Sequence, residues 1–373
     1  MGTARANTLD MQASITTPVG FLTITNGTYK HSSTSNITTW TANPIIPATG
    51  GFWLNSGSTV TATAFTPTTL NGVLLRISNG IMNIGTTNIS FLMLGNNTNT
   101  LLLLKGGALN VSGGINSTGN TDTGTFTMTG GRVSTMTLLP GAVECLGLGS
   151  ATKFNMSGGL YRCLIGDNTT YDVNIRSATQ NVTGGTLQMG DPVTPIGTLN
   201  VWNLVLASPN KSTLLGSPIN VLNDLTINSG NTLVATYAGV LGNITIVGGN
   251  WTNNGTFMKS SNTVSFVGSA NTNIAGSSAN TFFNLTVNKV TNVTITSVAA
   301  QTVTNQLNLS NCTLTTGAYV IITTAACNVP SVVRASGRVI GNLSMAYPPA
   351  ASTTTFTYHI GDGTSYSPAT IFP

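Results

Sequence analysis

Pairs of residues ending in glycine, either Gly-Gly or Asn-Gly, return at a nearly constant interval through the first half of this chain, each beside an apolar, threonine-rich run. The second residues of these pairs are Gly27, Gly51, Gly80, Gly107, Gly131, Gly159 and Gly185. The interval stays close to about 26 positions, which is typical of repeat proteins in which each repeat packs only against its neighbours. We expect these glycines to form the turns of the repeat.

Short strands dominate the secondary structure that the sequence predicts. Residues 22–25, 60–63, 109–112 and 125–128 alternate apolar and polar side chains, which places one side of each strand in a core. No segment carries a capped 3.6-residue apolar stripe, so helix should be scarce. Coils of about 24–29 residues made of short strands favour an all-β fold, a right-handed parallel β-helix, which is a β-solenoid. A β-propeller needs about 40–50 residues per blade, and a β-sandwich array has no fixed phase.

A longer repeat is present in the second half. Residues 201–206 recur as 282–287, and residues 221–227 recur as 303–309, so both segments return after about 81–82 positions. Three coils of about 27 residues would explain this spacing. The expected organisation is an N-terminal segment (1–20), a first solenoid half (21–195), a second half with the three-coil repeat (196–345) and a β-rich tail (346–373).

Composition limits the functional classes open to the chain. Charged residues make up 6% of it, against about 25% in ordinary soluble domains, so Thr, Ser, Asn and Gly must cover the surface. Such uncharged surfaces favour an extracellular location. The 13 lysines and arginines are dispersed, which argues against a nucleic-acid partner. No apolar stretch approaches the ~18 residues of a membrane span. No signal peptide is visible in residues 1–12, so a secreted chain would be numbered after processing or belong to a longer polypeptide.

The chain has four cysteines, Cys145, Cys163, Cys312 and Cys327. An even number in a secreted protein permits two disulfides, and proximity pairs the first with the second and the third with the fourth. The alternative is four buried thiols that act as small apolar residues. Since no CxxC occurs and the only histidines are His31 and His359, we expect no zinc site, and nothing in the sequence indicates a cofactor.

Catalysis on polysaccharides would need two carboxylates that face each other across a cleft. The acidic residues are Asp10, Asp122, Glu144, Asp167, Asp172, Asp191, Asp224 and Asp362. Asp167, Asp172 and Asp191 lie near Arg162 and Arg176 and form the best candidate for a calcium or saccharide site, but single aspartates more often tighten turns. No nucleophile–base pair, P-loop or dinucleotide motif occurs, so we do not expect an enzyme.

Two further residue types bear on saccharides. The tryptophans Trp40, Trp53, Trp202 and Trp251 are candidates for stacking on sugars, although burial is their commoner role. Sequons for N-glycosylation begin, for example, at Asn26, Asn88, Asn110, Asn181, Asn250 and Asn292. Stacked asparagine ladders at turns would explain these asparagines equally well.

Residues 225–233, 244–257 and 283–287, together with the tail at 359–371, resemble the repeat regions of very large secreted adhesin-like proteins of Bacteroidetes-type bacteria. The resemblance covers residues 200–373 well and the first half loosely. It implies an extracellular or cell-surface location, reached by type IX secretion, and a structural or adhesive role. It carries over no catalytic residues.

The expected function is therefore that of a non-enzymatic extracellular β-solenoid with a structural or adhesive role. Exposed end strands favour head-to-tail association of identical chains into a filament. Surface glycans are a further candidate partner. The alternatives are a carbohydrate-binding or polysaccharide-cleaving β-helix, and a phage-type fibre, which would form trimers.

Overall fold

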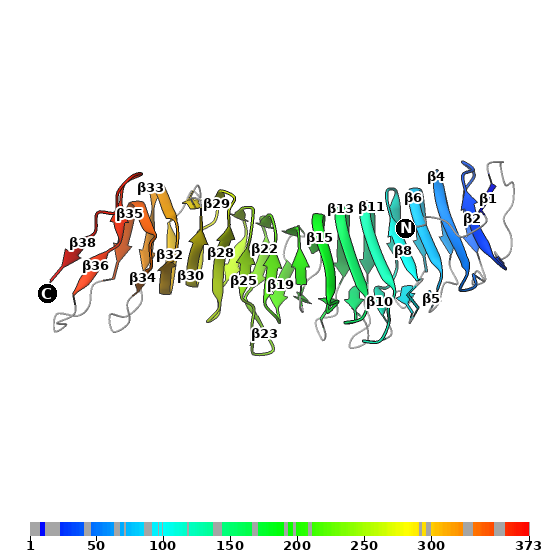
Figure 1. Ribbon diagram of the computed structural model, residues 1–373, viewed down its shortest axis with the longest axis horizontal. Coiled ribbons are helices and arrows are strands. Elements are labelled where there is room, and N and C mark those ends of the chain that lie inside the picture. Colours follow the sequence, from blue (N-terminus) through cyan, green and yellow to red (C-terminus); the bar gives the residue numbers. More distant parts are fainter. Residues whose placement is uncertain are drawn as a thin grey trace. The chain divides into compact units, whose positions relative to one another are not determined.

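The computed structural model describes residues 8–11, 23–40, 46–62, 68–70, 72–85, 92–95, 97–98, 100–117, 119–136, 144–165, 171–189, 193–196, 199–207, 211–290, 293–295, 300–323, 331–346 and 355–372. In these ranges the regular secondary structure consists of β-strands, without a helix (Figure 1). The chain divides into two units, Met1–Trp202 and Asn203–Pro373, and each is a β-solenoid of stacked parallel strands. The two units together hold about 12 turns, which confirms the predicted all-β solenoid. Its right-handed sense stays a prediction.

The strands of the first unit are β1 (Thr8–Met11), β2 (Gly27–His31), β3 (Ile37–Trp40), β4 (Gly50–Ala62), β5 (Thr68–Leu70), β6 (Leu74–Ile84), β7 (Leu92–Leu94), β8 (Leu101–Leu104), β9 (Ala108–Val111), β10 (Ile115–Ser117), β11 (Thr125–Met136), β12 (Leu146–Leu148), β13 (Lys153–Ile165), β14 (Val173–Ile175), β15 (Thr179–Met189), β16 (Val193–Ile196) and β17 (Leu199–Val201).

The strands of the second unit are β18 (Asn203–Leu206), β19 (Lys211–Leu215), β20 (Ile219–Val221), β21 (Leu225–Ile227), β22 (Asn231–Val234), β23 (Thr236–Tyr237), β24 (Val240–Leu241), β25 (Ile244–Ile246), β26 (Trp251–Asn253), β27 (Thr256–Met258), β28 (Thr263–Gly268), β29 (Thr272–Ala275), β30 (Thr281–Lys289), β31 (Val293–Ile295), β32 (Gln301–Leu309), β33 (Thr313–Thr323), β34 (Val332–Arg334), β35 (Arg338–Met345), β36 (Phe356–Tyr358), β37 (Ile360–Gly361) and β38 (Ala369–Ile371).

Coils of the first unit have three faces. The first face holds the strand segments before the corner glycines, such as β8, and the second face holds those after them, such as β9. The third face is formed by β5, β7, β10, β12 and β14, each paired in parallel with the next. Because side chains alternate along a strand, each face sends every second residue into the core.

An eleven-residue block that spans the first and second faces keeps its length from β6 to β15, whereas the corresponding block of β4, residues 51–62, has one residue more. In register order the blocks are residues 74–84, 101–111, 125–135, 153–163 and 179–189. The connection that follows the block varies, from residues 112–114 after β9 to residues 137–145 after β11. The irregular gaps between the glycine pairs therefore come from connections on the third-face side.

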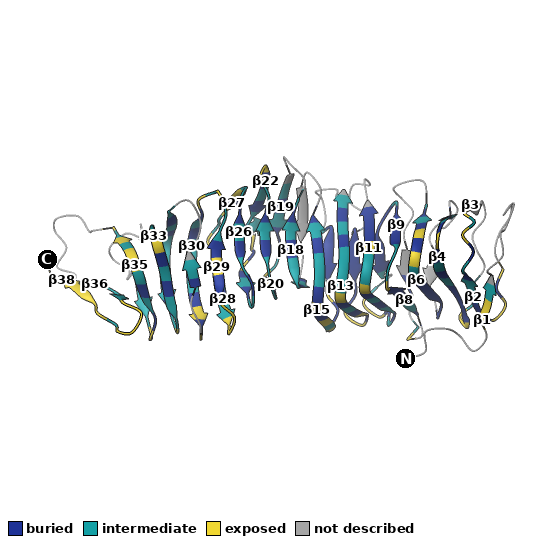
Figure 2. Cartoon of the chain, turned by 90° about the horizontal axis from the view of Figure 1, so that it is seen from above, coloured by how far each residue is buried: buried dark blue, intermediate teal, exposed yellow. Residues whose placement is uncertain are grey.

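The core consists of rows of inward side chains, one from each coil. Figure 2 shows the strands banded in buried and half-buried residues, as this alternation requires. One buried row of the second face contains Met82, Leu109, Val133, Tyr161 and Leu187. In the second unit the rings of Trp251, Phe257 and Phe282 pack edge-on or tilted, with centroids 4.9–5.8 Å apart. Fully burying a large side chain stabilises a fold by about 1.5–3 kcal/mol, so these rows dominate its cohesion.

Five of the predicted turn glycines form one column at the corner between the first and second faces. They are Gly80, Gly107, Gly131, Gly159 and Gly185, with φ between 66° and 91°. A Cβ on Gly107 would lie 2.3 Å from the carbonyl oxygen of Gly80, and one on Gly131 would lie 2.7 Å from that of Gly107. Both the positive φ and this close stacking of backbones restrict the corner to glycine.

The first two glycines of the predicted series do not belong to this column. Gly27 has a φ of 80° but pairs with Gly50, at the start of the first face. Gly51 is an extended residue of β4 and not a turn, so that part of the prediction is wrong. It is glycine because a Cβ there would lie 2.9 Å from the Cβ of Leu74 on the next coil.

Some coils of the second unit are shorter than predicted, whereas others keep the predicted length, as where Leu225 pairs with Trp251. In the shorter coils Leu204 pairs with Leu225, for example, and Ile244 pairs with Val264. From Val221, four successive strand pairings lead through one row of the core to Leu309. The longer repeat would instead make Leu309 equivalent to Ile227. Ile227 pairs with Asn253, which belongs to a different row. The explanation of that repeat as three equal coils is therefore wrong.

A ladder of amide side chains runs through the core of the second unit. Asn253 Nδ2 donates to Asn280 Oδ1 (2.9 Å). Asn280 Nδ2 in turn donates to Gln301 Oε1 (2.6 Å). The indole of Trp251 also donates to Asn280 Oδ1, at 2.9 Å. All four side chains are fully buried, so these bonds satisfy groups that have left water.

Candidate functional site

Three of the carboxylates that the structure describes accept backbone N–H groups, two of them within a turn and one from the next coil. Asp122 accepts the N–H of Gly119 (3.0 Å), Asp224 accepts that of Asn250 (2.8 Å), and Asp362 accepts that of Thr364 (2.7 Å). Asp172 is buried, whereas Asp167 and Asp191 lie outside the described residues. Within the described ranges, no group of three or more His, Cys, Asp or Glu side chains is arranged to hold a metal ion.

Glu144 lies just before β12 of the third face, and its carboxylate interacts with two neighbouring side chains. Its Oε1 accepts a hydrogen bond from Asn174 Nδ2 (3.1 Å), and its Oε2 lies 3.7 Å from Arg176. Burial raises the pKa of the Glu144 carboxyl, against the lowering effects of Arg176 and Asn174. A lone carboxyl paired in this way does not form the facing pair that glycoside hydrolysis uses.

The described tryptophans do not form an open stacking platform. Trp251 is fully buried in the aromatic cluster of the second unit. Trp53 lies in register between Lys30 and Arg76, whose Nζ and Cζ atoms are 4.8 and 3.8 Å from its ring centroid. Trp202 is half-buried, and the side chain of Trp40 lies outside the described part.

The cysteines are thiols wherever the structure describes them. Cys145 and Cys163 are buried and are not joined as a disulfide, and Tyr161 donates its hydroxyl to the carbonyl of Cys145 (2.8 Å). The second expectation, of small buried residues, therefore holds for these two. Cys312 is also a thiol, and Cys327 lies outside the described residues.

Lys289 is a buried cation in the second unit, with 1% of its surface exposed. Its Nζ donates to the carbonyls of Val247 (3.2 Å) and Val267 (2.6 Å), which belong to the two preceding coils. Burial lowers the pKa of Lys289 and raises that of nearby Cys312 to about 11. The bonds from Lys289 tie its coil to the two coils before it. A protonated thiol is a poor nucleophile, so Cys312 is not poised for nucleophilic attack.

Two of the sequon asparagines use their amide nitrogens in ladders. Asn110 Nδ2 donates to Asn83 Oδ1 (2.8 Å), and Asn250 Nδ2 donates to Asp224 Oδ1 (3.1 Å). The ladder interpretation of these positions therefore has direct structural support. Asn88 and Asn292 lie outside the described residues.

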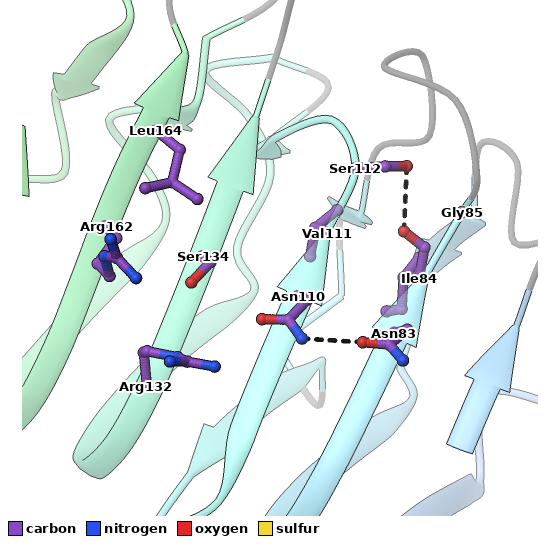
Figure 3. Close-up of a pocket in the computed structure, with 10 residues that line it drawn as sticks. All are labelled: Asn83, Ile84, Gly85, Asn110, Val111, Ser112, Arg132, Ser134, Arg162 and Leu164. Atoms are coloured by element: carbon purple, nitrogen blue, oxygen red, sulfur yellow. Dashed lines mark hydrogen bonds between the residues drawn. The ribbon is translucent and has the colours of Figure 1, made fainter. Parts of the chain in front are cut away.

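A groove of about 390 Å³ opens on the second face of the first unit (Figure 3). It crosses β6, β9, β11 and β13, and its lining residues are Asn83, Ile84, Gly85, Asn110, Val111, Ser112, Arg132, Ser134, Arg162 and Leu164. Parallel strands lie about 4.8 Å apart, so the groove is roughly 14 Å across these four strands. It combines two guanidinium groups, two amides and the half-buried side chain of Leu164.

Four of the residues that line this groove share one position in the repeat. Asn83, Asn110, Ser134 and Arg162 each lie three residues after a glycine of the corner column, and the register places them in one outward row. Along the sequence, Arg162 is close to Asp167, Asp172 and Asp191, and this proximity gives no reason to group it with the other residues of the row. The third residue after each corner glycine is the sequence signal that reveals the row.

No protein-family model, curated protein sequence or solved structure matches this chain. In the part that the structure covers, no helix has both the length and the apolar character needed to cross a bilayer. The functional argument therefore rests on the residues themselves.

Proposed function

We propose that the protein is a non-enzymatic structural or adhesive β-solenoid that works at the cell surface or outside the cell, as the resemblance of its second half to adhesin-like repeats suggests. The observation that carries this proposal is that outward polar side chains bond one coil to the next. Examples are Asn110 to Asn83 (2.8 Å) and Asn305 to Asn284 (2.7 Å). Each such bond contributes about 0.5–1.5 kcal/mol net, in addition to the backbone ladder.

A row of neutral amides suits exposure to variable salt and pH, because it does not depend on ion pairs that salt screens. The location is tested by treating intact cells of the source organism with a protease and following the chain with an antibody. Loss of the chain from intact cells would support a surface location. Protection until the cells are lysed would contradict it.

We propose further that identical chains associate end to end. Among the described residues, β1 pairs only with β2, and residues 342–345 of β35 pair only with β33. A strand with one open edge is a template for another strand. Beside β1, a groove of about 470 Å³ is lined by Thr8, Leu9, Ile24 and Tyr29 among others, and Leu9 is 63% exposed. An open edge beside an exposed apolar residue fits a second copy, and unlike ends joined in this way produce filaments.

Light scattering and negative-stain electron microscopy test the association. We expect filaments whose formation Leu9→Asp abolishes, because the substitution places a charge at the proposed joint. Val240→Asp is the matched control, since Val240 is 42% exposed on the hairpin of β23 and β24. Monodisperse monomers at high concentration would refute end-to-end association, and trimers would favour the fibre alternative.

A further inference from the structure

We propose that the groove on the second face of the first unit binds an acidic oligosaccharide, with Arg132 and Arg162 holding its carboxylate or sulfate groups. The inference deepens the proposed adhesive function by naming the class of ligand, and it rests on that function. The whole site lies within β6, β9, β11 and β13.

The two guanidinium groups supply an anion site. Arg132 is exposed on β11, and Arg162 is half-buried on the adjacent β13, in register with Ser134. The described ion pairs are Lys30 with Asp10 and Arg176 with Glu144, so neither groove arginine has a described acidic partner.

Arg162 adds a second, independent observation. Its Nε is buried and has no hydrogen-bond partner among the described residues. A buried N–H of a charged group that makes no bond costs about 1–3 kcal/mol or more, and an oxyanion in the groove would remove this cost. Arginine presents its N–H groups as a planar fork that matches carboxylate and sulfate oxygens in pairs.

The amides beside the arginines can take sugar hydroxyls. Asn110 Nδ2 donates to Asn83 Oδ1 (2.8 Å), and Asn83 Nδ2 donates to Thr61 Oγ1 (3.3 Å). This direction of donation leaves Asn110 Oδ1 on the β11 side, away from Asn83 (Figure 3). An acceptor fixed by a neighbouring coil is preorganised to receive a hydroxyl, which limits the entropy lost on binding.

The floor of the groove suits a sugar ring. Gly85 and Ser112 are small and keep the groove open, and Ser112 turns its hydroxyl onto the carbonyl of Ile84 (3.2 Å). Leu164 is half-buried and contributes apolar surface against which the C–H face of a sugar can pack, whereas the side chains of Ile84 and Val111 are 1% exposed and belong to the core. A mixture of apolar surface and a few placed polar groups is typical of small-ligand sites.

The same features disfavour other anionic macromolecules. None of the described residues that line the groove is aromatic, whereas single-stranded nucleic acids are held by stacking on aromatic rings. The four strands that it crosses are paired with neighbouring coils on both sides, so an extended peptide finds no open edge on them. An oligosaccharide is therefore the occupant that the groove favours.

Calorimetric titration tests the proposal with four probes: a short oligogalacturonate, a sulfated dextran oligosaccharide, the corresponding neutral dextran and a single-stranded oligonucleotide. We expect binding of one or both acidic saccharides, and binding of only one identifies the anion as carboxylate or sulfate. Equal binding of neutral dextran, or tighter binding of the oligonucleotide, would overturn the proposal.

Matched variants localise the site. Arg132→Gln with Arg162→Gln should weaken binding by roughly tenfold or more, as expected for loss of charged hydrogen bonds. Lys105→Gln with Lys153→Gln removes the same charge from exposed positions outside the groove and should change affinity less than about twofold. An equal loss in both pairs, or no loss in the first, would refute the assignment.

Two further measurements keep the outcome unambiguous. Circular dichroism and the thermal midpoint show whether the double variant is folded, and Arg162→Lys, which keeps the charge but loses the fork, should also weaken binding. Assembly is measured on the same samples without saccharide. The arginine variants should assemble normally and Leu9→Asp should still bind saccharide, so failure of one proposal is distinguishable from failure of the other.

Discussion

Replacing Asn280 by leucine should be among the most destabilising single changes in the second unit. Asn280 Oδ1 accepts two hydrogen bonds, from Trp251 Nε1 and Asn253 Nδ2, each 2.9 Å long. Leucine has similar bulk but no polar atoms, so both donors lose their bond to Asn280, and the buried Gln301 Oε1 loses the bond that Asn280 Nδ2 donates. At about 1–3 kcal/mol for each donor, the unfolding free energy should fall by about 2–6 kcal/mol.

Urea unfolding followed by tryptophan fluorescence measures this loss, because Trp251 lies at the ladder. With a denaturant slope of about 2.5 kcal/mol/M, a loss of about 4 kcal/mol lowers the midpoint by about 1.6 M. Asn273→Leu is the control, since Asn273 makes a ladder bond to Asn250 (3.1 Å) but is exposed, and its loss should cost less than about 1 kcal/mol. Equal midpoint shifts in the two variants would refute the argument that burial makes the ladder costly to break.

Three further outcomes follow from the structure. Gly131→Ala should lower the unfolding free energy by at least about 2 kcal/mol in thermal unfolding, because φ is 71° and the new Cβ would meet backbone, whereas Gly57→Ala should be neutral because no atom lies within 4 Å of its Cβ position. Since the pKa of Cys312 is raised to about 11, its alkylation by iodoacetamide, followed by mass spectrometry, should be slow near neutral pH and accelerate about tenfold per pH unit up to that value; a neutral-pH rate equal to that of the urea-unfolded chain would contradict this. The pKa of Glu144 is raised in the folded state, so the folded carboxyl takes up a proton before the unfolded one as pH falls from about 7 toward about 4.5. The unfolding free energy of wild type should therefore rise relative to that of Glu144→Gln over this pH range. Parallel pH profiles of the two proteins would count against this reasoning.

The solenoid could be predicted from the sequence because its period comes from local requirements. A corner such as Gly107 needs a positive φ and space for the previous coil, and both demand glycine. The exact positions of the corners were harder to predict, because glycine also occurs where only close packing requires it, as at Gly51 beside Leu74. In the second unit a corner such as residues 222–224, Leu-Asn-Asp, contains no glycine, so the recurrence of similar strands there does not report the period.

The candidate site was harder to predict than the fold. Arg132 and Arg162 are far apart in the sequence, and nothing local connects them. Their proximity depends on the register between β11 and β13, which includes irregular steps at the corner. The unsatisfied Nε of Arg162 depends on the tertiary surroundings alone, which a single sequence does not contain.

The eleven-residue block from β6 to β15 and the variable connections after it tolerate different changes of sequence. Substitutions within the block must preserve core rows and corners, whereas the connection can differ from residues 112–114 to residues 137–145 without altering the register of the next coil. New loops can therefore be displayed along one edge of the first unit, provided that Gly85 and Ser112, the first connection residues beside the groove, are kept. Foreign peptides can be grafted on that edge by design without changing the strands that carry the groove.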